Sequence, residues 1–75
     1  MYDNLKAEMA RAHVTTFNLS RELHISRQSV YSKLRNASYW NIKEMVIIQS
    51  YLKAMLPERE EKLTLDYLFN GDDEW

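Results

Sequence analysis

The feature that most constrains this chain is a very short link between two helical segments. Leu19 and Leu23 repeat at a spacing of four before the link, and Val30 and Leu34 repeat in the same way after it. This spacing predicts two helices, each with one apolar face. Residues 24–25 are all that lies between Leu23 and the polar residue that opens the next segment. The two helices must therefore cross steeply in a tight helix-turn-helix.

Composition indicates one small helical domain. The 75 residues include one Gly, one Pro and no Cys, which favours helix over strand and excludes a disulfide framework or a thiolate metal site. No apolar run approaches the roughly 18 residues that a membrane span needs. The N-terminal stretch MYDNLKAEMARAH lacks a signal-peptide core. We therefore expect an intracellular, cytoplasmic protein without a membrane contact.

Capping residues predict five helices and no strand. Asn4 or Asp3 is expected to cap the first helix, which ends near His13. The second helix follows Thr15 and the third follows Ser26, both good N-cap residues. We expect residues 1–70 to form a single helix-turn-helix domain and residues 71–75 to form an acidic tail.

A fourth helix opens with a capping box at Asn41 and Glu44 and ends by Leu56, because Pro57 disfavours helical geometry before it. Its apolar face is formed by Ile42, Met45, Ile48 and Leu52. The charged connector of residues 57–62 is compatible with one helical turn. Thr64 caps the last helix, residues 65–69.

The near-zero net charge hides an asymmetry. Residues 1–56 hold eight Lys or Arg against four acids, whereas residues 57–75 hold two against seven. A basic body with an acidic end is compatible with a polyanionic partner for the body.

The third helix leaves a varied polar face outside its two apolar residues. This face carries Arg27, Gln28, Tyr31, Ser32 and Arg35. Gln pairs with the adenine edge, Arg with guanine, and short hydroxyls with either edge of the bases in duplex DNA. The outer face is therefore a candidate for reading a DNA sequence.

The residues from Leu5 to about Leu52, and again residues 63–69, resemble the lambda-repressor-like (Cro/C1-type) helix-turn-helix family of small phage and mobile-element regulators. The string of residues 25–30, ISRQSV, is close to that family's usual opening of the recognition helix. Ser20, His24 and Val30 stand where the family has a small residue, a turn residue and an aliphatic anchor. The resemblance implies an all-α, five-helix domain with the helix-turn-helix in helices two and three.

The chain departs from the family pattern in two places. His24 occupies a turn position that usually holds Gly with a left-handed backbone, so some strain is expected. Leu34 follows Val30 by four residues where many members have three. This difference implies a small rotation of the helix, and it leaves open whether Ser32 or Lys33 points most directly into the groove.

The family resemblance implies that the start of the third helix enters the major groove of DNA. The predicted base-contacting residues are Arg27, Gln28, Tyr31 and Ser32. Hydroxyls and amides at helix starts, together with nearby basic and polar side chains, are expected to hold phosphates. These predicted phosphate contacts are Thr15, Thr16, Ser26, Lys33, Arg35, Asn36 and Ser38.

Apolar residues beyond the needs of a small core suggest a homodimer on a palindromic operator. The candidates for the dimer interface are Ile47, Tyr51, Tyr67, Phe69 and Trp75. An alternative is that these residues complete a single core.

The predicted function is that of a Cro-like transcriptional regulator, with repression as the family's usual mode. Two alternatives are a protein-interaction adaptor that retains the fold and an antitoxin of a toxin pair. No constellation of acid, base or nucleophile indicates an enzyme, and no cofactor, metal site or small-molecule ligand is expected.

Overall fold

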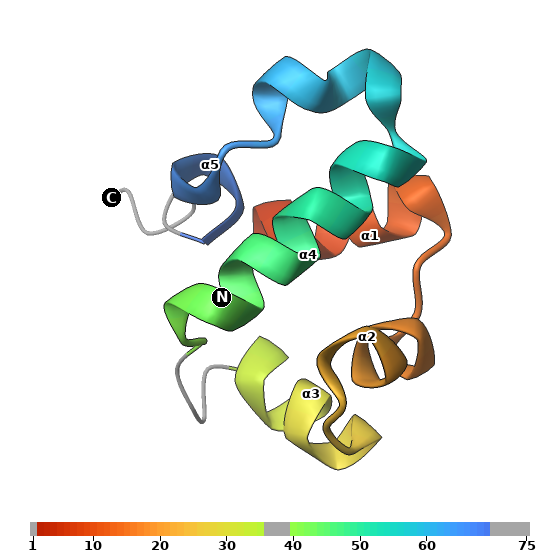
Figure 1. Cartoon of the computed structure of the whole chain (residues 1–75), viewed down its shortest axis with the longest axis vertical. Helices are drawn as coiled ribbons and strands as arrows, with labels where there is room; N and C mark the ends of the chain where they lie inside the picture. The colour runs from red at the N-terminus through yellow and green to blue at the C-terminus, as the bar shows by residue number, and fades with distance from the viewer. Residues whose placement is uncertain (1, 36–39, 70–75) are drawn as a thin grey trace.

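The computed structural model describes residues 2–35 and 40–69, and within these residues the secondary structure consists of helices joined by short turns, with no strand (Figure 1). The prediction of an all-α chain is confirmed. The elements are α1 (Asp3–Ala12), α2 (Thr16–Leu23), α3 (Arg27–Leu34), α4 (Ile42–Met55), the 3-10 helix η1 (Pro57–Lys62) and α5 (Leu65–Phe69).

Side-chain caps begin α2 and α3 where the sequence predicts. The Thr15 hydroxyl accepts a hydrogen bond from the Asn18 amide at 3.2 Å, and the Asn18 side chain accepts one from the Thr15 amide at 2.8 Å. The Ser26 hydroxyl accepts from the Ser29 amide at 3.1 Å. Each cap satisfies amides that have no partner within the helix, which fixes where the helix begins.

The predictions for α4 and the C-terminal elements also hold. Asn41 and Glu44 form a reciprocal capping box, with distances of 2.8 and 3.1 Å. The helix ends before Pro57, and the whole connector forms η1. Thr64 accepts from the amide of Tyr67 at 3.1 Å at the start of α5.

The predicted cap of α1 is wrong. Tyr2 precedes the helix, and no side chain caps its first turn. Asn4 instead donates its side-chain amide to the carbonyl of Tyr67 at 3.0 Å. The side chain of Asn4 therefore bonds to a residue of α5 that is distant in the sequence, and it does not cap its own helix.

The link between α2 and α3 is as tight as expected. His24 has a left-handed backbone with φ of 58°, and the amide of Ile25 bonds the carbonyl of Ser20 at 3.1 Å. Ser20 is buried, and its hydroxyl donates to the carbonyl of Phe17 at 2.8 Å. The small Ser side chain satisfies its own polar group and leaves room for the neighbouring helix. We call Thr16–Leu34 the α2–turn–α3 unit.

One core joins the five α-helices, and α4 runs through the middle of the molecule in Figure 1. Ile42, expected on the apolar face of α4, is 60% exposed, so that expectation is wrong. Its position in the first turn places it beyond the edge of the core. The buried apolar residues are Tyr2, Leu5, Met9, Ala12, Val14, Leu19, Leu23, Val30, Leu34, Trp40, Ile48, Leu52, Leu56, Leu63, Leu68 and Phe69.

An aromatic cluster closes one end of this core. Tyr2, Trp40 and Phe69 pack edge to face, with ring centres 6.1 to 6.5 Å apart. Such contacts add to the stabilisation from burial of the rings. They join the start of α1, the residue before the capping box of α4, and the end of α5.

A buried carboxylate joins the N-terminal and C-terminal helices. Glu8 is fully buried and accepts hydrogen bonds from Arg59 at 2.7 and 2.9 Å and from the Tyr67 hydroxyl at 2.8 Å. Arg11 adds a contact at 3.2 Å. Burial alone would raise the pKa of Glu8, but the hydrogen bonds from Arg59 and Tyr67 and the two positive charges outweigh it and lower the pKa.

The substitution Glu8→Gln is expected to make the free energy of unfolding depend less on pH in the acidic range. Because the pKa of Glu8 is lowered on folding, its stabilisation is present above the ordinary value of 4.5 and is lost as the pH falls through the folded-state pKa. Urea unfolding at pH 7 and at pH 3 measures this effect. The variant should be less stable than the wild type at pH 7, with a smaller difference at pH 3. Glu58→Gln, at an exposed position, is the control; equal differences for Glu8→Gln at both pH values would contradict the assignment.

Within the described residues, no helix combines the length and the apolar character that crossing a membrane requires.

Candidate nucleic-acid interface

Two buried side chains hold α3 against the rest of the molecule. Val30 is completely buried and Leu34 nearly so, and both belong to the core formed with Leu19 and Leu23 of α2. An α-helix turns by about 100° per residue. Ser32 therefore lies on the side of α3 opposite the two anchors, and Gln28 lies within about 40° of it. The outermost surface of α3 is polar.

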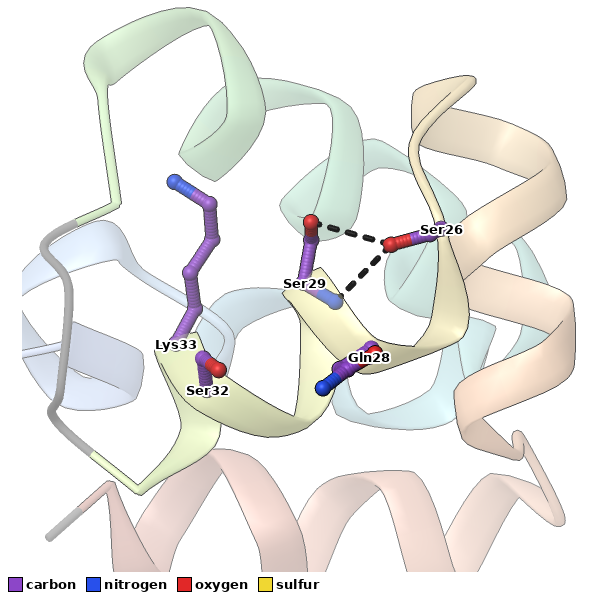
Figure 2. Close-up of a pocket in the computed structure, with 5 residues that line it drawn as sticks. All are labelled: Ser26, Gln28, Ser29, Ser32 and Lys33. Carbon is purple, nitrogen blue, oxygen red and sulfur yellow. Dashed lines mark hydrogen bonds between the residues drawn. The ribbon is translucent and has the colours of Figure 1, made fainter.

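The predicted base-contacting residues occupy two different directions. Gln28 is exposed and Ser32 is partly buried on the side of α3 opposite the two anchors. Arg27 is directed toward Phe17 of α2, and Tyr31, which is 54% exposed, lies about 40° from Arg27 around the helix. A pocket of about 240 Å³ is lined by Ser26, Gln28, Ser29, Ser32 and Lys33. Figure 2 shows how these five side chains lie along and just before α3. We call this pocket the hollow. This surface offers amide and hydroxyl groups of the kinds that read base edges.

Lys33 turns away from this outer surface. Its ammonium nitrogen lies 3.1 Å from a carboxylate oxygen of Glu44 and 5.6 Å from the ring centre of Trp40. Of the two residues, Ser32 lies opposite the buried anchors of α3, whereas the ammonium group of Lys33 is directed to Glu44 of α4. The contact links the end of α3 to the first turn of α4, and it partly neutralises a charge predicted to bind phosphate.

The cap hydroxyls are also used inside the protein. Thr15 donates its hydroxyl to the side-chain oxygen of Asn18 at 2.9 Å, and Ser26 donates to the hydroxyl of Ser29 at 3.0 Å. A contact from either hydroxyl to phosphate would have to exchange one of these bonds. Ser29, which the sequence analysis did not single out, accepts a hydrogen bond from the Ser26 hydroxyl. The hydroxyl hydrogen of Ser29 can itself be donated to a group in the hollow. The three-residue spacing of the serines in α3 is the signal that could have identified it.

The other predicted phosphate contacts have different surroundings. Thr16 is half-buried in the first turn of α2, and Arg35 is exposed just after α3. Asn36 and Ser38 lie outside the described residues.

The structure adds an aromatic residue and an arginine on α2 that the sequence analysis missed. Phe17 is 47% exposed. The guanidinium carbons of Arg21 and Arg27 lie 5.7 and 5.6 Å from the centre of its ring. Phe17 stands two residues before Leu19 and therefore off the apolar face of its helix. An aromatic residue at such a position is the feature of the sequence that could have identified it.

The residues predicted for dimer contacts separate into distinct classes. Ile47 is 40% exposed, and Tyr51 and Tyr67 are partly buried against the core. The prediction that Phe69 lies in a dimer interface is wrong, because Phe69 is only 5% exposed and packs within the aromatic cluster. Trp75 lies outside the described residues. For Phe69, the alternative of completing a single core holds.

Comparison of the chain with protein-family models, with curated proteins and with solved structures finds no match in any of the three.

The contact of Lys33 with Glu44 is expected to stabilise the fold modestly. A double-mutant cycle with Lys33→Met and Glu44→Gln, followed by urea unfolding, should give a coupling energy of about 0.5–1 kcal/mol, because both side chains keep some access to water. Met retains the apolar stem beside Trp40. A coupling energy of zero would show that the two charges do not interact in solution.

Proposed function

We propose that this protein is a sequence-specific double-stranded DNA-binding transcriptional regulator with a lambda-repressor-like helix-turn-helix fold. In this proposal the α2–turn–α3 unit is the helix-turn-helix and α3 is the recognition helix. The observation that carries the proposal is the division of α3 into a face anchored by Val30 and Leu34 and an opposite face that bears the exposed Gln28 and the partly buried Ser32.

The two outward side chains have suitable chemistry for base edges. The amide of Gln28 can donate to and accept from adenine, and the hydroxyl of Ser32 can contact any of the four base pairs. The ring of Tyr31 at the side of the helix can contact a thymine methyl or reach a phosphate. Because α3 is held by buried anchors, these groups approach DNA in a defined register.

Exposed positive charge supports contacts with the DNA backbone. Arg35 follows α3 directly, and Thr16 lies at the positive end of α2, where an amide can meet a phosphate. These contacts position the protein and make affinity depend on salt, but they carry no sequence information.

A second copy would extend the contact with DNA. Two domains on half-sites about 34 Å apart would bind a palindromic operator more tightly than one domain. In this proposal the dimer contact on α4 involves the exposed Ile47 and the partly buried Tyr51. Repression by blocking access to the operator is the simplest regulatory mode.

The exposed apolar residues also favour one alternative, a protein-interaction adaptor. Ile42, Val46, Ile47 and Met55 are all at least 40% exposed on α4. An adaptor would use this helix to contact a different protein and would bind duplex DNA without specificity or not at all. An antitoxin would combine both properties.

The decisive experiment is selection of bound sequences from a pool of random duplexes. A regulator should enrich one sequence, arranged as a palindrome if it binds as a dimer, and should lose affinity steeply as salt rises. An adaptor should enrich none. Failure to retain any duplex at low salt would rule out the proposed function.

Gln28→Ala should weaken binding to the selected site by about 1–3 kcal/mol and relax preference at one base pair. Arg35→Ala is the contrasting variant and should weaken all duplexes alike, reducing the salt slope by about 1. Lys33→Ala should change the slope less than Arg35→Ala, because Glu44 already pairs with Lys33. Fluorescence anisotropy on selected and scrambled duplexes measures all three; equal losses on both duplexes for Gln28→Ala would contradict its role.

Ile47→Asp should prevent self-association, because it would bury a charge in the proposed interface. Sedimentation at several protein concentrations, with and without the selected duplex, measures the effect. Ile42→Asp, at the other exposed isoleucine of α4, is the control, since Ile42 lies on a different side of the helix. A wild-type protein that stays monomeric throughout would contradict the dimer.

A further inference from the structure

Phe17 brings two arginines from different helices to one exposed ring. Arg21 follows it by one turn on α2, and Arg27 opens α3 across the tight link. Their guanidinium carbons lie at 5.7 and 5.6 Å from the ring centre, within the range of a cation–π contact. All three side chains are exposed. We call Phe17, Arg21 and Arg27 the arginine clamp.

The two arginines of the arginine clamp lack an acidic partner in the part of the chain that the structure describes. Within residues 2–35 and 40–69, the ion pairs involve Arg11, Arg59 and Lys33, and no carboxylate pairs with Arg21 or Arg27. Two like charges gathered at one ring repel each other, and a bound anion would relieve this repulsion. The ring attracts both cations and so holds them ready for a shared anion.

We infer that the arginine clamp binds one phosphate of the DNA backbone, with each guanidinium donating to one of the two non-bridging oxygens. This inference rests on the proposed function for the identity of the polyanion. A phosphodiester suits the site because guanidinium forms short, charge-assisted hydrogen bonds with phosphate oxygens. Phe17 is a positioning residue that acts through the two arginines.

The inference changes the role of Arg27 from reading a base to holding the backbone. Arg27 lies about 140° around α3 from Ser32, on the side nearer α2. Its contact with Phe17 directs the guanidinium toward α2, away from the outward surface of Gln28. Sequence preference would then depend on Gln28 and Ser32, with Arg27 setting the register of the helix on the duplex.

The first test measures salt dependence and sequence preference together. Arg21→Gln and Arg27→Gln should each lower affinity equally on selected and scrambled duplexes and reduce the salt slope by about 1. Phe17→Leu, which keeps an apolar side chain but removes the ring, should weaken binding by about two- to fivefold. Phe17→Tyr keeps the ring and should restore wild-type binding. Circular dichroism checks that each variant is folded.

Two results of this test would overturn the arginine clamp. A loss confined to one base pair for Arg27→Gln would show that Arg27 reads a base. An unchanged affinity and salt slope for Arg21→Gln would show that Arg21 contacts no phosphate.

A second test uses inorganic phosphate as the probe and does not require duplex binding. In titrations followed by NMR, the Nε–Hε signals of Arg21 and Arg27 should shift together, more than that of the exposed Arg35, and the shifts should shrink in Phe17→Leu. Such shifts in a protein that binds no duplex would support the clamp and refute the proposed function. Shifts no larger than those of Arg35 would refute the clamp even if the protein binds DNA.

Discussion

Burial of Val30 and Leu34 is the interaction on which the rest of the structure depends. Full burial of an aliphatic side chain contributes about 1.5–3 kcal/mol, so these two residues supply much of what holds the eight-residue α3 in place. Such a short helix would be marginal in isolation. Because its attachment uses so few residues, the rest of α3 is available for other contacts.

The tight link makes this attachment directional. The left-handed backbone of His24 and the small side chain of Ser20 allow α3 to pack closely against α2. A non-Gly residue in this conformation is strained by about 1–2 kcal/mol, which the shared core must offset. The same geometry brings Arg27 to the ring of Phe17, so the turn also determines where positive charge gathers.

The balance of charges explains why the net value of −1 says little about partners. The buried Glu8 pairs with Arg11 and Arg59, and Glu44 pairs with Lys33 at the junction of α3 and α4. Within the described residues, Arg21, Arg27 and Arg35 on α2, α3 and just after α3 have no carboxylate partner. Unpaired cations on the α2–turn–α3 unit and at its end therefore accompany a slightly acidic total, and the proposed phosphate contacts require such cations.

Local interactions explain what the sequence by itself determined. The starts of α2, α3 and α4 and the anchoring of α3 depend on residues three or four positions apart, and the end of α4 depends on Pro57 restricting the residue before it. A linear sequence records such short spacings. The tertiary structure alone decided that Asn4 bonds to α5, that Phe69 enters the core, that Lys33 turns to Glu44 and that Arg27 meets Phe17. Each of these outcomes depends on a partner from another element, and its position is set by how the helices pack.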